Sequence, residues 1–166
     1  MPLGRMYTVD SGQVTLASAS QTPMLLVSTT TTAICDIQAI RVGAVSSSSA
    51  VFPGTATVQA YLARAANSPT GGTPVTPRPH NPADIPANTA WTVGSWTAAP
   101  TFGNILWGQV IPFTAGANWA EWVTPGAEWR IGPVSSTGAA AYAAVFLTCS
   151  SAGTATAFSI ELVFSE

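Results

Sequence analysis

The residues of this chain that could do chemistry are few and widely spaced. The only histidine, His80, lies between two prolines in the stretch PRPHNP (77–82). Arg78 stands two residues before it and would suit a carboxylate or phosphate contact, but a lone histidine in a loop is more often simply solvated. The sequence places no nucleophile beside His80, and it contains no G-x-S-x-G elbow for a catalytic serine.

The carboxylates form no close pair in the sequence, although Glu121 and Glu128 bracket a turn among tryptophans. A glycosidase needs two carboxyl groups that face each other across the bond to be cleaved. Such pairs meet only in the folded chain, so one alternative is a hydrolase with Glu121 and Glu128 in a groove. The other is surface ion pairing with Arg130. Since the sequence also lacks a phosphate loop, an EF-hand loop and a zinc pattern, we expect no enzyme, no cofactor and no metal.

Two cysteines, Cys35 and Cys149, lie in apolar stretches with the character of strands, TAICDIQAI and AAVFLTCSS. Neither has a second cysteine or a histidine at metal-ligand spacing. Synthesis in a reducing cytosol favours two buried free thiols. A disulfide between the two strands is the alternative.

The elements that would position all these residues are strands. The closing stretch AFSIELVFS (157–165) alternates apolar Phe158, Ile160, Leu162 and Phe164 with a second, more polar face. AYAAVFLTC (141–149) is apolar on both faces, which predicts a central strand covered on both sides. Turn sequences separate further short stretches, and none of them has a helical apolar period. We therefore predict an all-β fold, a single β-sandwich or jelly-roll domain over residues 1–166 with about eight to ten strands.

One long stretch fits neither a helix nor an interior strand. TGGTPVTPRPHNPADIPANTAW (70–91) contains five prolines, each of which removes a backbone donor and pushes its predecessor into an extended conformation. We predict a stiff proline-rich loop over about residues 69–88, lying across its own sandwich or onto an adjacent subunit. An ordinary packed surface loop is the alternative.

The composition combines a large apolar content with very little charge. The chain is 47% hydrophobic and 7% charged, against about 25% charged residues in an average soluble domain, and it contains no lysine. A net charge of −2 without a basic stripe disfavours nucleic-acid binding. No apolar run approaches the roughly 18 residues of a membrane span, and the stretch MPLGRMYTVD does not resemble a signal peptide. Such a surface suits a protein that packs against other proteins.

The tryptophans are concentrated in one part of the chain. All six fall within residues 91–129: Trp91, Trp96, Trp107, Trp119, Trp122 and Trp129. Tryptophan is favoured at interfaces and at sugar-stacking platforms, so a subunit interface and a carbohydrate-binding face compete with an ordinary aromatic core. Trp119 and Trp122 would point to opposite faces of a strand, which weakens the idea of a flat sugar platform.

Several stretches together resemble a known family. RMYTV (5–9), IQAIRVG (37–43), YLARAANSPTGGTPVTPRP (61–79), the W…W.TPG.EW segment (119–129) and FSIELVFSE (158–166) follow one another across nearly the whole chain. This pattern resembles small virion proteins of tailed bacteriophages, the capsid decoration (cement) proteins. The resemblance includes no catalytic motif. It implies a β-rich protein, often trimeric, that sits on the outside of the capsid and clamps neighbouring capsomers.

The expected function is therefore structural. The resemblance implies a homotrimer made in the host bacterial cytoplasm and carried on the outer surface of the virion, with the major capsid protein as its partner. From the composition we expect neither nucleic acid nor a membrane as a partner. A glycan-binding β-sandwich module of a phage head or tail fibre is the alternative. The candidate interface residues come from the proline-rich segment and from the tryptophans: Pro74, Pro77, Arg78, Pro79, His80, Trp91, Trp96, Trp119 and Trp122.

Overall fold

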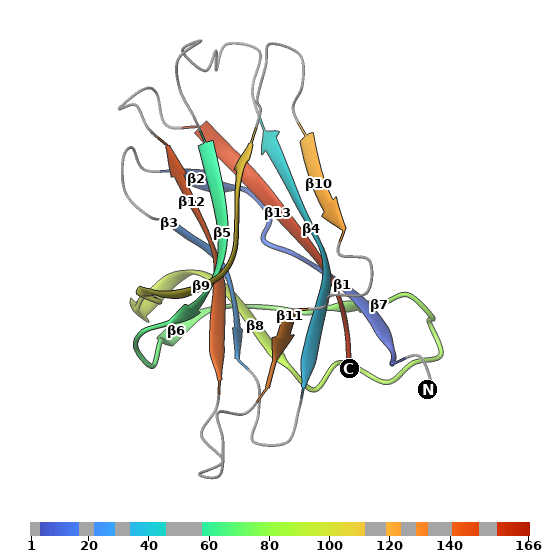
Figure 1. The fold of residues 1–166 in the computed structure, drawn as a ribbon. Helices are drawn as coiled ribbons and strands as arrows, with labels where there is room; N and C mark the ends of the chain where they lie inside the picture. The colour runs from blue at the N-terminus through green and yellow to red at the C-terminus, as the bar shows by residue number, and fades with distance from the viewer. Residues whose placement is uncertain are drawn as a thin grey trace.

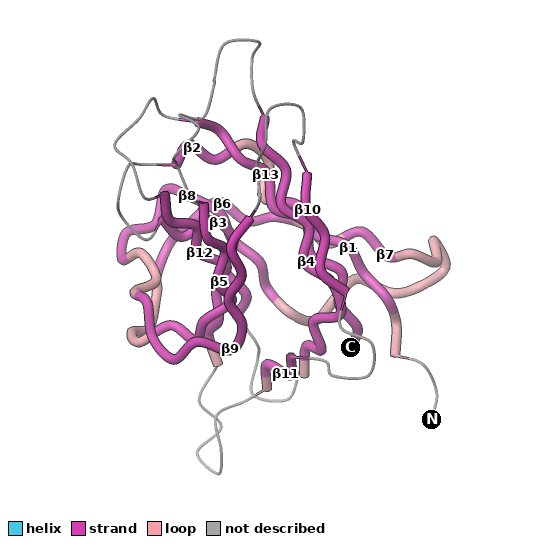
Figure 2. The backbone as a smooth tube through the Cα atoms, turned by 45° about the horizontal axis from the view of Figure 1, so that its top comes forward, coloured by secondary structure: helices cyan, strands magenta, loops and turns pink. Residues whose placement is uncertain are grey.

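The chain folds into two antiparallel sheets packed on one another, as Figures 1 and 2 show. The computed structural model describes residues 4–16, 22–28, 34–45, 58–111, 119–123, 129–132, 141–149 and 156–166. Over these ranges the structure confirms the all-β sandwich. The same ranges hold no helix long and apolar enough to cross a membrane.

The first sheet, sheet A, has seven strands in the order β10-β4-β13-β1-β7, with β11 also paired to β4 and β2 to β13. Its strands are β1 (Met6–Asp10), β2 (Val14–Leu16), β4 (Cys35–Val45), β7 (Arg78–Pro79), β10 (Trp119–Val123), β11 (Trp129–Ile131) and β13 (Thr156–Ser165).

The second sheet, sheet B, has six strands in the order β6-β8-β3-β12-β5-β9. They are β3 (Thr22–Ser28), β5 (Val58–Ala65), β6 (Thr70–Val75), β8 (Ala90–Ala98), β9 (Phe102–Ile111) and β12 (Tyr142–Cys149). The thirteen strands of the described ranges exceed the predicted eight to ten. The difference arises because β2, β7 and β11 are only two or three residues long, and because the proline-containing β6 also pairs.

The core between the sheets follows the predicted alternation. In β13 the four predicted apolar side chains are at most 1% exposed, while Ser159 and Glu161 on the other face are half-buried. β12 lies between β3 and β5, as expected of a strand that is apolar on both faces. Its residues Val145 and Leu147 belong to the main core, whereas Ala144 and Phe146 belong to a second apolar cluster on the outer face of sheet B.

The second cluster is covered because the two ends of sheet B approach each other over its outer face. The ring of Phe102, at the start of β9, packs edge-on against Phe146 with centroids 5.1 Å apart. Asn67, which precedes β6, donates from Nδ2 to the Ala99 carbonyl (2.8 Å) and accepts from the Thr101 amide (2.9 Å). The loop before β6 is thereby bound to the loop before β9. Sheet B is thus strongly curled.

The paired glycines of the TGG sequence allow β6 to lie close to β8. Gly72 has a φ of +93°, and a Cβ atom there would lie 2.6 Å from Nε1 of Trp96. Gly71 has a φ of +75°, and its Cβ atom would lie 2.8 Å from the Thr97 amide nitrogen. Both positions therefore need glycine, for backbone conformation and for space. The Trp96 ring lies on the backbone at Gly72, and its Nε1 donates to Thr92 Oγ1 (3.2 Å).

We expect Gly72→Ala to destabilise the fold by roughly 3 kcal/mol, because the new methyl group adds steric overlap to left-handed strain. Gly12→Ala is the matched control: Gly12 also has a positive φ (+63°), but no atom lies within 4 Å of the new Cβ. It should cost only about 1 kcal/mol. Urea unfolding of both variants measures the difference, and equal losses would show that Trp96 does not need contact with this glycine.

Candidate functional site

Residues 76–89, between β6 and β8, cross from one sheet to the other along one side of the sandwich (Figure 1). We call this segment the strap. It leaves β6 at the edge of sheet B, pairs through β7 with β1 at the edge of sheet A, and returns to β8. The strap therefore lies across the sandwich of its own chain. Pro74 and Pro79 both lie in edge strands, where a missing amide donor is tolerated.

The far end of the strap is held by the side chain of Glu166. Its Oε2 accepts from the Asn88 amide (2.8 Å), and its Oε1 accepts from the amide (2.8 Å) and the hydroxyl (2.5 Å) of Thr89. Beside them, Arg5 and Glu166 exchange two backbone hydrogen bonds of 3.1 Å each. Hydrogen bonds to a charged group are about twice as strong as neutral ones, so this carboxylate is a firm anchor.

The same anchor extends into the core through Trp91. Its Nε1 donates to Thr89 Oγ1 (3.0 Å), and its ring packs on Phe164 with centroids 4.9 Å apart. Phe164 in turn stacks on Tyr7 at 5.3 Å. Trp91 is only 2% exposed. This candidate interface residue therefore belongs to the core, where it connects sheet B to sheet A.

Tyr7 of β1 holds the middle of the strap through a side-chain hydrogen bond. Its hydroxyl donates to the Ile85 carbonyl (3.0 Å). Burial raises the pKa of the Tyr7 phenol, and the negative charge of Glu166 raises it further. The phenol therefore stays protonated and remains a donor over the physiological range. At the β7 end, the His80 amide donates to the Met6 carbonyl (2.8 Å).

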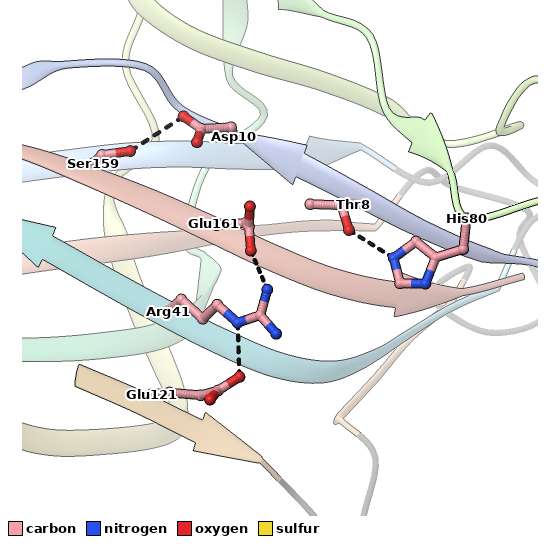
Figure 3. A network of polar contacts seen from close by, with 7 residues as sticks. All are labelled: Thr8, Asp10, Arg41, His80, Glu121, Ser159 and Glu161. Atoms are coloured by element: carbon pink, nitrogen blue, oxygen red, sulfur yellow. Dashed lines mark hydrogen bonds and ion pairs between the residues drawn. The ribbon is translucent and has the colours of Figure 1, made fainter. Parts of the chain in front are cut away.

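The outer surface of the strap is exposed and mostly uncharged. Ile85 is 51% exposed although its own carbonyl is bound to Tyr7. Arg78 and His80 are also exposed, and the His80 Nε2 lies 2.7 Å from the Thr8 hydroxyl (Figure 3). Pro74 is exposed as well, whereas Pro77 and Pro79 are half-buried. A shallow hollow of about 410 Å³ lies beside His80, lined by Gly4, Arg5, Met6, His80, Asn81 and Asp84.

On the opposite side of the sandwich, tryptophan rings bridge the two sheets. Trp107 of β9 meets Trp122 of β10 at 5.0 Å and Trp129 of β11 at 5.6 Å between ring centroids. All three are half-buried and pack against the main core. Trp96 is half-buried over Gly72, and the side chain of Trp119 lies outside the described part. Each of the five described tryptophan side chains is thus buried or half-buried against other parts of the chain.

The outer face of sheet A carries a row of three charges. Arg41 of β4 lies between Glu121 of β10 and Glu161 of β13 in directly opposed positions. Its Nε donates to Glu121 Oε1 (2.7 Å), and its NH1 donates to Glu161, as Figure 3 shows. The hydrogen bond that Arg41 donates to Glu121, and after it the one donated to Glu161, raise the pKa of Arg41. The arrangement is a cross-strand ion-pair network, with Asp10 and Ser159 beside it in a hollow of about 260 Å³.

This network revises the expected ion pairing. Glu121 pairs with Arg41, while Arg130 makes a two-pronged contact with Asp36 through Nε (2.8 Å) and NH2 (2.9 Å). Glu128, the other half of the hydrolase pair, lies outside the described residues. Where the structure is described, no group of three or more metal-binding side chains comes together.

Cys35 is a free and fully buried thiol, in agreement with the preferred interpretation of the sequence. Burial raises its pKa well above the ordinary value, and the charges of Glu166 and Asp36 act in the same direction. The thiol is therefore protonated and unreactive in the folded chain. The side chain of Cys149 lies outside the described residues.

Comparison of the chain with protein-family models, with curated proteins and with solved structures gives no match. Function must therefore be argued from the geometry of the strap and the sheet edges, together with the resemblance in the sequence. The residues that hold the strap, Glu166, Thr89 and Tyr7, were not singled out by the sequence. Their partners lie 77 to 78 residues away along the chain, so no local motif could indicate them.

We expect Glu166→Gln to lower the free energy of unfolding by roughly 2 kcal/mol. An amide NH2 group replaces one carboxylate oxygen, and it cannot accept a hydrogen bond from the strap backbone. Glu121→Gln is the control: Glu121 is an exposed member of an ion pair and should cost only about 0.5 kcal/mol. Urea unfolding of the two variants gives the comparison. Equal losses would mean that Glu166 is no more than a surface charge.

We also expect the Cys35 thiol to react with a thiol reagent at least about a hundredfold more slowly in the folded chain than in urea. A Cys149→Ser background leaves Cys35 as the only reporter. Since the folded pKa is raised, the buried thiol stabilises the fold fully below its ordinary pKa of 9.0, and this contribution declines as the pH rises above that value. Rapid labelling at pH 7 without denaturant would contradict the burial.

Proposed function

We propose that this chain is a structural virion protein that decorates a bacteriophage head, binding the major capsid protein on the outer surface and stabilising contacts between capsomers. The sequence resemblance supports this proposal. The structural observation that carries it is the strap, a proline-stiffened segment anchored at both ends that holds an exposed isoleucine, Ile85, away from the sandwich.

Anchoring matters because binding must offset the entropy of ordering a loop. Immobilising flexible side chains and segments on binding costs free energy, and a segment already fixed avoids most of that cost. The strap is fixed by Tyr7, by Glu166 and by the β7–β1 pairing before any partner arrives. A weak contact made by each copy would be sufficient, since contacts repeated around a symmetric shell add by avidity.

The distribution of charge supports a role within an assembly. Among the described strands, those of sheet B contain one charged residue, Arg64, whereas those of sheet A contain seven. Because sheet B carries so little charge, another protein could cover it without the desolvation penalty of burying unpaired charges. The homotrimer that the resemblance implies is a separate matter, because the described residues of one chain give no argument for three copies.

The glycan-binding alternative has no specific observation in its favour. Five tryptophan side chains are described, and each is buried or half-buried against other parts of the chain.

We expect Ile85→Asp to weaken binding to purified phage heads by at least about tenfold, because it buries an unpaired charge in the contact. The backbone carbonyl of residue 85 can still accept the hydrogen bond from the Tyr7 hydroxyl, so the fold should be retained. Ile34→Asp is the matched control, since Ile34 is 43% exposed but lies outside the strap, and it should bind normally. Co-sedimentation with heads measures both variants.

Three outcomes would contradict parts of this proposal. Failure of the unsubstituted chain to bind heads of the phage that encodes it would overturn the decoration function. Equal binding by Ile85→Asp and the unsubstituted chain would exclude the strap as the contact. Equal loss in both aspartate variants would also exclude a specific role for Ile85.

A further inference from the structure

The edge strands of the two sheets are not equally protected. Proteins usually block edge strands with prolines, charges, bulges or short lengths, since an open edge can pair with another chain. β6 contains Pro74 and two register shifts, β7 is two residues long and contains Pro79, and β10 is five residues long and carries Glu121. Each of these edges is therefore obstructed.

The remaining edge strand of sheet B, β9, has none of these obstructions over its second half. It is ten residues long, without proline or charge, and no described strand pairs with its outer side. Residues Trp107–Ile111 pair in regular register with Leu62–Val58 of β5. On the side away from β5, their backbone donors and acceptors are paired with no described strand. Two exposed large apolar side chains also lie on this strand, Ile105 at 55% and Val110 at 44%.

We propose that β9 pairs antiparallel with β9 of a second copy of this chain, about a twofold axis at Gln109. The axis places each Gln109 opposite its counterpart, Val110 opposite Gly108, and Trp107 opposite Ile111. Because side chains alternate along a strand, this register sets outer face against outer face and inner face against inner face. The two six-stranded sheets then become one continuous sheet.

In this register, the side chains of residues 107–111 are complementary to the same residues of the second copy. A glutamine side chain offers both donors and an acceptor, so two of them can bond to each other, whereas a charged residue at the axis would repel its copy. Gly108 has no side chain, and the Tyr61 ring lies directly against it, with Cδ1 2.7 Å from an ideal Cβ position. Val110 of the second copy, opposite Gly108, would lie beside that ring and lose its exposure to water.

The absence of charge extends beyond β9. No charged residue lies between Asp84 and Glu121, a stretch that includes all of β8 and β9. Two copies brought together at this edge therefore meet no like charges on these strands. An isologous contact of this kind closes as a dimer. It is independent of shell binding, and it differs from the trimer that the sequence resemblance implies.

Light scattering and sedimentation equilibrium of the unsubstituted chain should give a concentration-dependent dimer. Gln109→Glu and Gln109→Arg each place two like charges opposite each other at the axis, and each should weaken the dimer by at least about tenfold. Gln109 is exposed, so both variants should keep the thermal midpoint that the unsubstituted chain has at a concentration low enough for it to be monomeric. An equimolar mixture of the two should restore the dimer, because opposite charges then face each other.

Thr73→Arg is the matched control, since it adds a charge to an exposed position on the obstructed edge strand β6 and should leave the dimer intact. A monomer, a trimer, a dimer insensitive to both Gln109 variants, or a mixture that does not re-associate would each overturn the β9 pairing. Head binding with no dimer would overturn this inference alone. A dimer that binds no heads would overturn only the proposed function.

Discussion

The hydrogen bonds to the Glu166 carboxylate are the interaction on which one whole side of the sandwich depends. They fix the strap where it returns to β8, and through Thr89 they also orient the indole of Trp91. Trp91, Phe164 and Tyr7 then form a continuous aromatic contact from one sheet to the other. A polar anchor at the surface and an apolar connection in the core are thus parts of one structure.

The two sides of the sandwich are closed by different means, and this difference separates their roles. On one side the strap covers the sheet edges with prolines and with backbone hydrogen bonds to β1. On the other side, the rings of Trp107, Trp122 and Trp129 join the sheets, and no described strand pairs with the outer side of β9. The closed side is the surface proposed to bind the capsid, whereas the open side is the one proposed to extend its sheet into a second copy.

The sequence predicted those features that depend on local periodicity. Alternation in β13 identified a strand with one buried apolar face, and the double apolar character of β12 identified a central strand, because burial of a strand face leaves a period of two in its residues. The proline-rich segment over about residues 69–88 was predicted to be a loop outside the sheet interior, but residues 70–75 and 78–79 form strands β6 and β7, which lie at sheet edges. Its pairing with β1 was not foreseen, because a two-residue strand has no periodicity to detect.

The candidate site was less predictable, because its residues meet through distant contacts. The clustering of the tryptophans along the sequence did not reveal that Trp91 is a core residue, that Trp96 covers a glycine, or that three others bridge the sheets. Those outcomes depend on strand order, which single-sequence patterns do not specify. The ion pairs differ from expectation for the same reason: Arg41 and Glu121 are 80 residues apart and meet only because β4 and β10 are neighbours.

The double hydrogen bond between Arg5 and Glu166 has a practical consequence for molecular engineering. Residues at the two extremes of the described chain sit side by side, so a short peptide could join them and new ends could be opened elsewhere. Cargo fused at either extreme would emerge from one spot beside the strap. On the phage head proposed as its partner, cargo at both positions would leave the sandwich from the same side.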